Sequence, residues 1–268
     1  ITKGNGPGEM FSCALGLHSN ASDNFYLQDP NSKTCYIVDL KTLLNSRKFV
    51  PDEQFRYSSE VLPTSDLCLL DDNRYIGYHM WYLDDKQFSK VDSPLGYYQK
   101  GEDSGKGMDD FPFFVASVNG ARLFKNPQTQ ELWTADMHRD AIRIYNDSLK
   151  QIRELVGPDH FSPEYTRRQI DAPVAFVTFA DECDYHAYTD YYITDKHIYL
   201  VYEGNKHFDM KNLSPVEIFK LDFDGNLLCN YKLDRYVYSI SINKKEDTLY
   251  CASRPSVMEP PVILKYKL

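Results

Sequence analysis

An internal repeat is the feature that most constrains the fold of this chain. The segment Phe25–Asp39 can be laid over Leu132–Asn146 without a gap, which places Asp29 on Asp136. Each copy consists of an apolar segment, a polar turn that begins with Asp, and a second apolar segment. The period-two alternation of these segments predicts β-strands. An Asp at the end of a strand suits a turn in which its carboxylate accepts hydrogen bonds from the following backbone amides.

Three further copies of the strand–turn–strand unit begin near Arg74, His197 and Thr248, the first of them weaker than the others. The copies are spaced by about 50 to 65 residues, which is the period of a propeller blade with insertions rather than that of a helical solenoid. Hardly any stretch has helical periodicity. The sequence therefore predicts an all-β fold, a β-propeller of four-stranded antiparallel blades, with about five blades visible in a single domain over residues 1–268.

The amino-acid composition favours β-strands and restricts which classes of molecule the protein can bind. Aromatic residues make up 14% of the chain, 21 of them Tyr, and such side chains favour half-buried pleated surfaces. The 30 basic and 39 acidic residues give a net charge of −9, and no basic cluster stands out. Nucleic acid and anionic membrane surfaces are therefore poor partners, whereas cationic or neutral partners remain open.

Two features of the sequence, a glycine-rich segment and six cysteines, do not match the motifs of cofactor or metal sites. The glycines of Gly4–Gly8 are followed by Glu-Met-Phe-Ser, whereas a phosphate-binding loop needs Gly-Lys and then Ser or Thr. We interpret this segment as a connection between blades, where tight reversals need glycine. None of the six cysteines forms a Cys-x-x-Cys pair, so no zinc or thioredoxin-type site is indicated. We expect no cofactor and no metal, and buried free thiols at Cys35, Cys68, Cys229 and Cys251.

The first residues also carry a family resemblance. The segment Gly4–Phe11, G-N-G-P-G-E-M-F, resembles the G-x-G-P-G-E-[FY] signature of the TolB-like six-bladed propellers that are common in Bacteroidetes. The spacing of Asp29 and Asp39 is similar to the blade pattern of that family. The resemblance implies six blades and an exported protein, periplasmic or at the cell surface, with membrane contact only through a lipid anchor upstream. The start on Ile1, directly before a turn, indicates that an N-terminal part is missing or removed.

Propeller geometry predicts where polar side chains would gather. The turn between the second and third strands of every blade lies on one face, so the ends of the second strands would bring Asp29, Asp136, Glu203 and Arg254 toward one mouth. The alternative is that each of these residues caps its own turn.

Two loops add candidate residues to this mouth. The turn Asp136–Asp140 adds His138 and Arg139, and an Asp–His pair could perform acid–base chemistry or hold a metal, although a solvated turn is the simpler interpretation. The long connection Asn205–Pro215, which contains His207, is a candidate ligand lid. The acidic segment Asp181–Asp190 lacks the order of an EF-hand and is predicted to be a surface loop.

Two functions from different classes follow. The first is an exported, non-enzymatic propeller that binds a small polar ligand, such as a glycan, or a partner protein through its loop-rich face. The alternative is a propeller hydrolase or lyase that acts on a sugar or lactone with carboxylates or a metal at the channel mouth. A pure scaffold would instead present an apolar patch. No motif in the sequence demands catalysis, so binding is the expectation.

Overall fold

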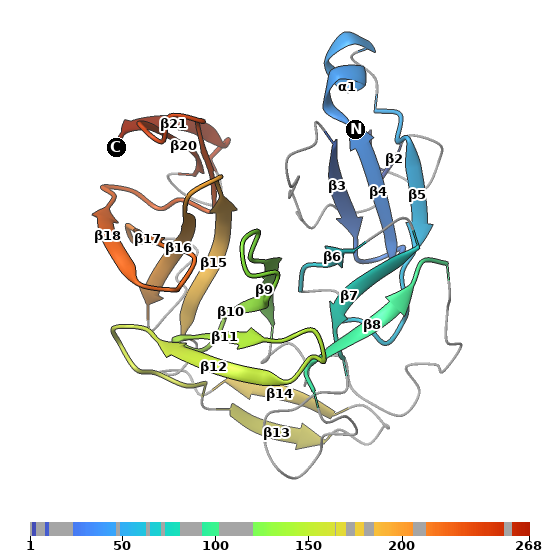
Figure 1. Cartoon of the computed structure of the whole chain (residues 1–268), viewed down its shortest axis with the longest axis horizontal. Coiled ribbons are helices and arrows are strands. Elements are labelled where there is room, and N and C mark those ends of the chain that lie inside the picture. The colour runs from blue at the N-terminus through green and yellow to red at the C-terminus, as the bar shows by residue number, and fades with distance from the viewer. Residues whose placement is uncertain are drawn as a thin grey trace. The chain divides into compact units, whose positions relative to one another are not determined.

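The structure is a computed structural model that describes residues 2–3, 9–10, 24–46, 49–62, 65–70, 73–80, 93–101, 120–163, 165–169, 175–179, 185–205, 213–254 and 259–268. Among these residues, strands predominate and one short helix, α1 (Leu40–Ser46), is present (Figure 1). The chain divides into two compact units. The first comprises Ile1–Ser117 and Gln169–Ala175, and the second comprises Val118–Arg168 and Phe176–Leu268.

The described part of the first unit contains two three-stranded antiparallel sheets and a short parallel strand pair. One sheet consists of β3 (Asn24–Asp29), β4 (Thr34–Asp39) and β5 (Glu53–Arg56), and the other of β6 (Cys68–Leu69), β7 (Arg74–Tyr78) and β8 (Leu95–Gln99). The parallel pair is β1 (Thr2–Lys3) with β2 (Glu9–Met10). The core of this unit gathers Tyr26, Cys35, Tyr57, Val61 and Tyr75.

The described part of the second unit contains two four-stranded sheets and one three-stranded sheet, all antiparallel. The first is formed by β9 (Ala121–Lys125), β10 (Leu132–Asp136), β11 (Ala141–Tyr145) and β12 (Gln151–Val156). The second is formed by β15 (His186–Ile193), β16 (Ile198–Asn205), β17 (Glu217–Leu221) and β18 (Leu227–Lys232). The third is formed by β19 (Ser239–Ile242), β20 (Thr248–Ser253) and β21 (Val262–Lys267). A strand pair, β13 (Tyr165–Gln169) with β14 (Ala175–Phe179), runs across the boundary between the residue ranges of the two units.

The strand pairing reproduces the repeat seen in the sequence. Tyr26 on β3 pairs with Ile37 on β4, and the equivalent Trp133 on β10 pairs with Ile144 on β11. The other copies supply β7, β16 and β20, each of which is the second strand of its sheet. The prediction of an all-β propeller with four-stranded antiparallel blades is confirmed, whereas the number of blades stays a prediction.

Strand β16 shows why the second unit is so rich in apolar residues. Side chains alternate across a strand, so Leu200 and Tyr202 enter the core shared with β9–β12, and Tyr199 and Val201 enter the core shared with β19–β21. A strand covered on both faces must be apolar on both faces. The second unit is therefore a stack of sheets in which β15–β18 is the middle layer.

The cysteines within the described residues are free thiols, as predicted. Cys35, Cys68 and Cys251 are buried, and Cys229 on β18 is half-buried rather than buried. Burial raises the pKa of Cys35 and of Cys251 to about 12, so these two thiols remain protonated and unreactive at neutral pH.

Candidate functional site

The structure places the predicted site residues in different parts of the chain. Asp136 ends β10, and His138 and Arg139 lie in the turn that follows. Glu203 lies near the end of β16, and Arg254 directly follows β20, so these five residues all belong to the second unit. Of the other two predicted residues, Asp29 belongs to the first unit, and His207 lies outside the described residues.

Asp29 caps its own turn. Its Oδ1 accepts hydrogen bonds from the backbone amides of Asn31, at 3.0 Å, and Ser32, at 3.4 Å. This is the arrangement that the sequence offered as the alternative to a ligand site.

Asp136 has a different environment, although it occupies the equivalent place in the repeat. Its side chain is 1% exposed, and its Oδ2 lies 3.2 Å from Nη1 of Arg143 and 3.5 Å from Nη1 of Arg139. Arg143 also places Nε at 3.3 Å from Oε2 of Glu154. The sequence analysis missed Arg143. An arginine within the otherwise apolar strand Ala-Ile-Arg-Ile-Tyr was a visible signal, because a buried arginine requires a carboxylate partner.

Glu203 is the second buried carboxyl group. Its side chain is 1% exposed; Oε1 accepts a hydrogen bond from the hydroxyl of Tyr236 at 3.2 Å, and Oε2 lies 3.9 Å from Nδ1 of His186. Oε2 is buried and accepts no hydrogen bond from the described residues. Burial raises the pKa of Glu203 above its ordinary value, while His186, the hydroxyls of Tyr236 and Thr189, and the charge of Arg122 act against this shift.

Two histidines pack against each other, and one of them, His186, lies beside Glu203. The ring of His138 packs edge-on against that of His186, with ring centres 5.2 Å apart. Nδ1 of His138 lies 3.0 Å from the carbonyl oxygen of Tyr185, to which it donates in the tautomer protonated at Nδ1. The backbone amide of Ala187 donates to the carbonyl of Met137, so the turn after β10 is fixed to the start of β15.

We call this group the strand-end cluster: Asp136, His138, Arg139, His186, Glu203 and Tyr236. It combines carboxylates, a guanidinium, two imidazoles and a phenol, and can therefore both donate and accept hydrogen bonds. Arg254 follows Ser253, whose hydroxyl donates to the carbonyl of Tyr236 at 2.6 Å. Nε of Arg254 is buried and forms no hydrogen bond with the part of the chain that the structure describes.

The acidic segment Asp181–Asp190 is only half within the described residues. That half is not the predicted surface loop, because His186–Asp190 belongs to β15 and pairs with β16. Ala187 and Tyr188 are buried there, and the carboxylate of Asp190 accepts a hydrogen bond from the amide of Ile240 at 2.9 Å. In the described ranges, no group of three or more His, Cys, Asp or Glu side chains is arranged to hold a metal ion. No helix among the described residues is long and apolar enough to cross a membrane.

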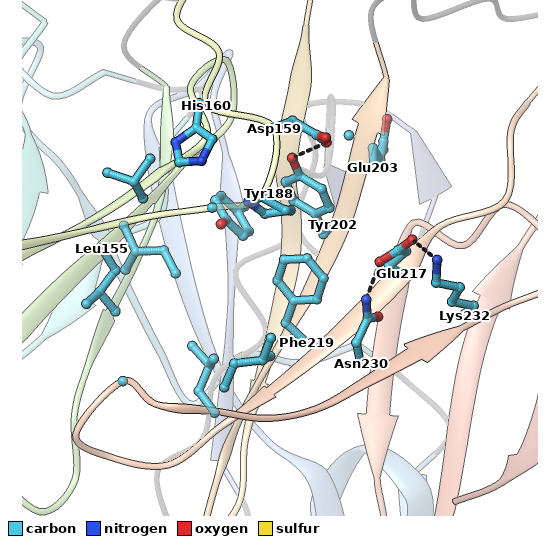
Figure 2. Close-up of a pocket in the computed structure, with 18 of the residues that line it drawn as sticks. Leu155, Asp159, His160, Tyr188, Tyr202, Glu203, Glu217, Phe219, Asn230 and Lys232 are labelled. Atoms are coloured by element: carbon cyan, nitrogen blue, oxygen red, sulfur yellow. Dashed lines mark hydrogen bonds and ion pairs between the residues drawn. The ribbon is translucent and has the colours of Figure 1, made fainter.

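A pocket with a volume of about 760 Å³ lies between the sheets β9–β12 and β15–β18 (Figure 2). Aromatic side chains of Tyr188, Tyr202 and Phe219 line it, together with Asp159, whose Oδ2 accepts a hydrogen bond from the Tyr202 hydroxyl at 2.7 Å. The sequence analysis did not identify this pocket. A tyrosine in a strand that is buried on both faces has the same sequence signature as an ordinary core residue.

Several solved structures resemble this chain. A member of the DUF4221 family from Bacteroides vulgatus has a TM-score of 0.54 and 9% identity, with 98% of this chain and 81% of that chain covered. A structure of BBS1N in complex with ARL6DN has a TM-score of 0.43 and 11% identity, covering 95% and 59% of the two chains. BamB from Moraxella catarrhalis has a TM-score of 0.35 and 11% identity, covering 95% and 74%. At these identities the first likeness concerns the fold alone, and the other two carry no argument.

No curated protein sequence matches the chain. The sequence model of the TolB-like 6-blade propeller-like family matches residues 1–245, which is most of the chain. This match agrees with the strand repeat and with the antiparallel sheets described above. The chain belongs to the family of TolB-like, six-blade propeller-like proteins.

Proposed function

We propose that the protein is a non-enzymatic β-propeller that binds a small polar ligand, or a polar segment of a partner protein, through the strand-end cluster. The observation that carries this proposal is the buried Oε2 of Glu203, which accepts no hydrogen bond from the described residues. Buried polar atoms in proteins nearly always have a partner, and leaving one without costs about 1–3 kcal/mol. A ligand that donates a hydrogen bond at this atom would remove that cost.

The side chains of the strand-end cluster define the chemistry of such a ligand. The Tyr236 hydroxyl can donate or accept a hydrogen bond, whereas the Arg139 guanidinium only donates. Arg139 is held beside Asp136, so a charged ligand group of either sign is repelled by a like charge nearby. A neutral ligand rich in hydroxyl groups, such as a glycan, suits this mixture best, because every hydroxyl can both donate and accept.

We also propose that the protein is exported and acts in the periplasm or at the cell surface. Support comes from the resemblance of Gly4–Phe11 to a family whose members usually carry a secretory or lipoprotein signal. Fractionation of cells that express the full-length gene tests this proposal. Recovery of the protein from the cytoplasm alone would contradict it.

One observation favours the alternative of a hydrolase or lyase. Glu203 has a raised pKa and lies beside His186, and a raised pKa makes a carboxyl group better suited to donate a proton to a leaving group. Formation of a product from any sugar or lactone in the binding experiment below would decide in favour of the enzyme.

The experiment is a screen of the melting temperature of the purified chain with a panel of sugars and lactones, with and without a chelator. Any compound that raises the melting temperature is then titrated calorimetrically to measure its affinity. We expect at least one glycan to bind, and we expect Glu203→Gln to weaken its binding about ten-fold, since one hydrogen bond to a charged group contributes about 1.4 kcal/mol or more. Glu131→Gln removes a half-buried carboxylate outside the cluster and is the control. Equal affinities in the two variants would contradict the proposed site.

A further inference from the structure

The pocket in Figure 2 is separate from the strand-end cluster and shares with it only Glu203. Its volume of about 760 Å³ is in the range of pockets that hold small organic molecules. Tyr188, Tyr202 and Phe219 lie at its buried side, each no more than 5% exposed. The rings of Tyr202 and Phe219 stack with their centres 4.7 Å apart. The buried side of the pocket is therefore a rigid aromatic surface.

The edges of the pocket are apolar and exposed. Val156 at the end of β12 is 55% exposed and Leu227 at the start of β18 is 57% exposed, and both side chains line the pocket. Apolar surface that a ligand removes from water favours binding in proportion to its area. An apolar molecule that enters between β12 and β18 would cover both side chains and contact the aromatic surface behind them.

One end of the pocket is negatively charged. Asp159 is exposed and binds the Tyr202 hydroxyl through Oδ2. Behind it, the buried Asp140 accepts hydrogen bonds from the backbone amides of Asp159 and His160 and from the Tyr188 hydroxyl. Lys232, the only Lys or Arg among the described lining residues, is paired with Glu217 at 3.3 Å (Figure 2). The end at Asp159 therefore has an excess of negative charge.

We propose that this pocket binds an amphipathic cation, a molecule with an apolar or aromatic body and an amine or quaternary ammonium group at one end. The body lies against Phe219 and between Val156 and Leu227. The cationic group lies beside Asp159 and the Tyr202 ring, where a carboxylate and an aromatic ring both attract it. The net charge of −9 attracts a cationic ligand to the protein from a distance.

Three small probes of similar size test the proposal by isothermal titration of the whole chain: (3-phenylpropyl)trimethylammonium, 4-phenyl-1-butanol and 4-phenylbutyrate. We expect the cation to bind with a Kd on the order of 1 mM, as its small number of atoms allows. The neutral alcohol should bind about three- to ten-fold more weakly, and the anion more weakly still. Equal affinity for the three probes, or no binding of the cation, would overturn the proposal.

Two pairs of variants locate the site. Leu227→Ser should weaken binding of the cation and the alcohol, whereas Leu228→Ser, at the next and equally exposed position of β18 outside the pocket lining, should not. Asp159→Asn should remove the preference for the cation, whereas Asp195→Asn, in an exposed turn outside the pocket, should retain it. If either pair behaves alike, the probe binds elsewhere and the assignment is wrong. Glycan binding at the strand-end cluster is measured separately in the Leu227→Ser variant and should be unchanged, so the two proposals can fail independently.

Discussion

Two buried carboxyl groups of the strand-end cluster differ in how their charge is compensated. Asp136 lies between the guanidinium groups of Arg139 and Arg143, so the protein itself supplies the opposing charge. Glu203 has a phenol and an imidazole as neighbours, and its pKa is raised by burial. Asp136 therefore belongs to a structural ion pair, and Glu203 is the carboxyl group at which we propose that a ligand binds.

The ion pair of Asp136 leads to a prediction on stability. Arg143→Met should lower the free energy of unfolding by about 2–4 kcal/mol, because it leaves a buried carboxylate with only one guanidinium neighbour. Arg235→Met is the control, since Arg235 and its partner Asp234 are both exposed, and it should change stability by less than about 1 kcal/mol. Urea unfolding measures both variants. Similar losses would show that the buried pair contributes little.

The raised pKa of Glu203 predicts a dependence of stability on pH. Folding favours the protonated carboxyl, so its contribution is complete below the ordinary pKa of 4.5 and is lost as the pH rises through the raised pKa. Glu203→Gln cannot ionise, and its free energy of unfolding should rise relative to that of the wild type as the pH increases above 4.5. Unfolding experiments over a pH series measure this difference. A constant difference would mean that Glu203 has the same pKa in the folded and the unfolded protein.

At the scale of elements, one glutamate connects two turns. Glu246 lies in the turn between β19 and β20, and its Oε2 lies 2.6 Å from Nδ1 of His197 and 3.4 Å from Nζ of Lys220. Its carboxylate also accepts hydrogen bonds from the hydroxyls of Thr194 and Tyr199. These partners come from β16, from β17 and from the turn between β15 and β16. Glu246 therefore holds two neighbouring sheets together at one end.

Removing the charge of Glu246 should change the free energy of unfolding with a pH dependence opposite to that of Glu203→Gln. Burial alone would raise the pKa of Glu246, but hydrogen bonds from Thr194 and His197 bring it below 4.5, so its contribution is present above pH 4.5 and lost as the pH falls through the lowered pKa. Glu246→Gln should cost about 1–2 kcal/mol at neutral pH, and the difference from wild type should shrink in acid. Chemical unfolding at neutral and acidic pH measures it; a cost that is independent of pH contradicts the assignment.

At the scale of the whole molecule, the sequence predicts one domain over residues 1–268. In the second unit, the sheet β15–β18 shares one core with β9–β12 and another with β19–β21. Tyr202 and Val201, on the two faces of β16, belong to these two cores. If the whole chain is built in this way, differential scanning calorimetry should give one transition. Val61→Ala in the first unit and Arg143→Met in the second should both lower its temperature. Two transitions that respond separately to these variants would show two domains.

The sequence by itself determined the strands and their order. The alternation in Phe25–Asp39 and its repeat in Leu132–Asn146 predicted two strands joined by a turn in each copy, which are β3–β4 and β10–β11, and the Asx-turn at Asp29 followed from one residue. These features could be read because period-two alternation and turn chemistry depend on neighbours within a few residues.

Only the tertiary structure decided which side chains meet across strands. Asp29 and Asp136 occupy equivalent places in the repeat, yet Asp29 caps a turn and Asp136 pairs with Arg143 from the next strand. The contact of His186 with Glu203 and the pocket at Phe219 likewise join residues from different strands or sheets. Such contacts depend on how the sheets pack on one another, and local periodicity carries no information about that packing.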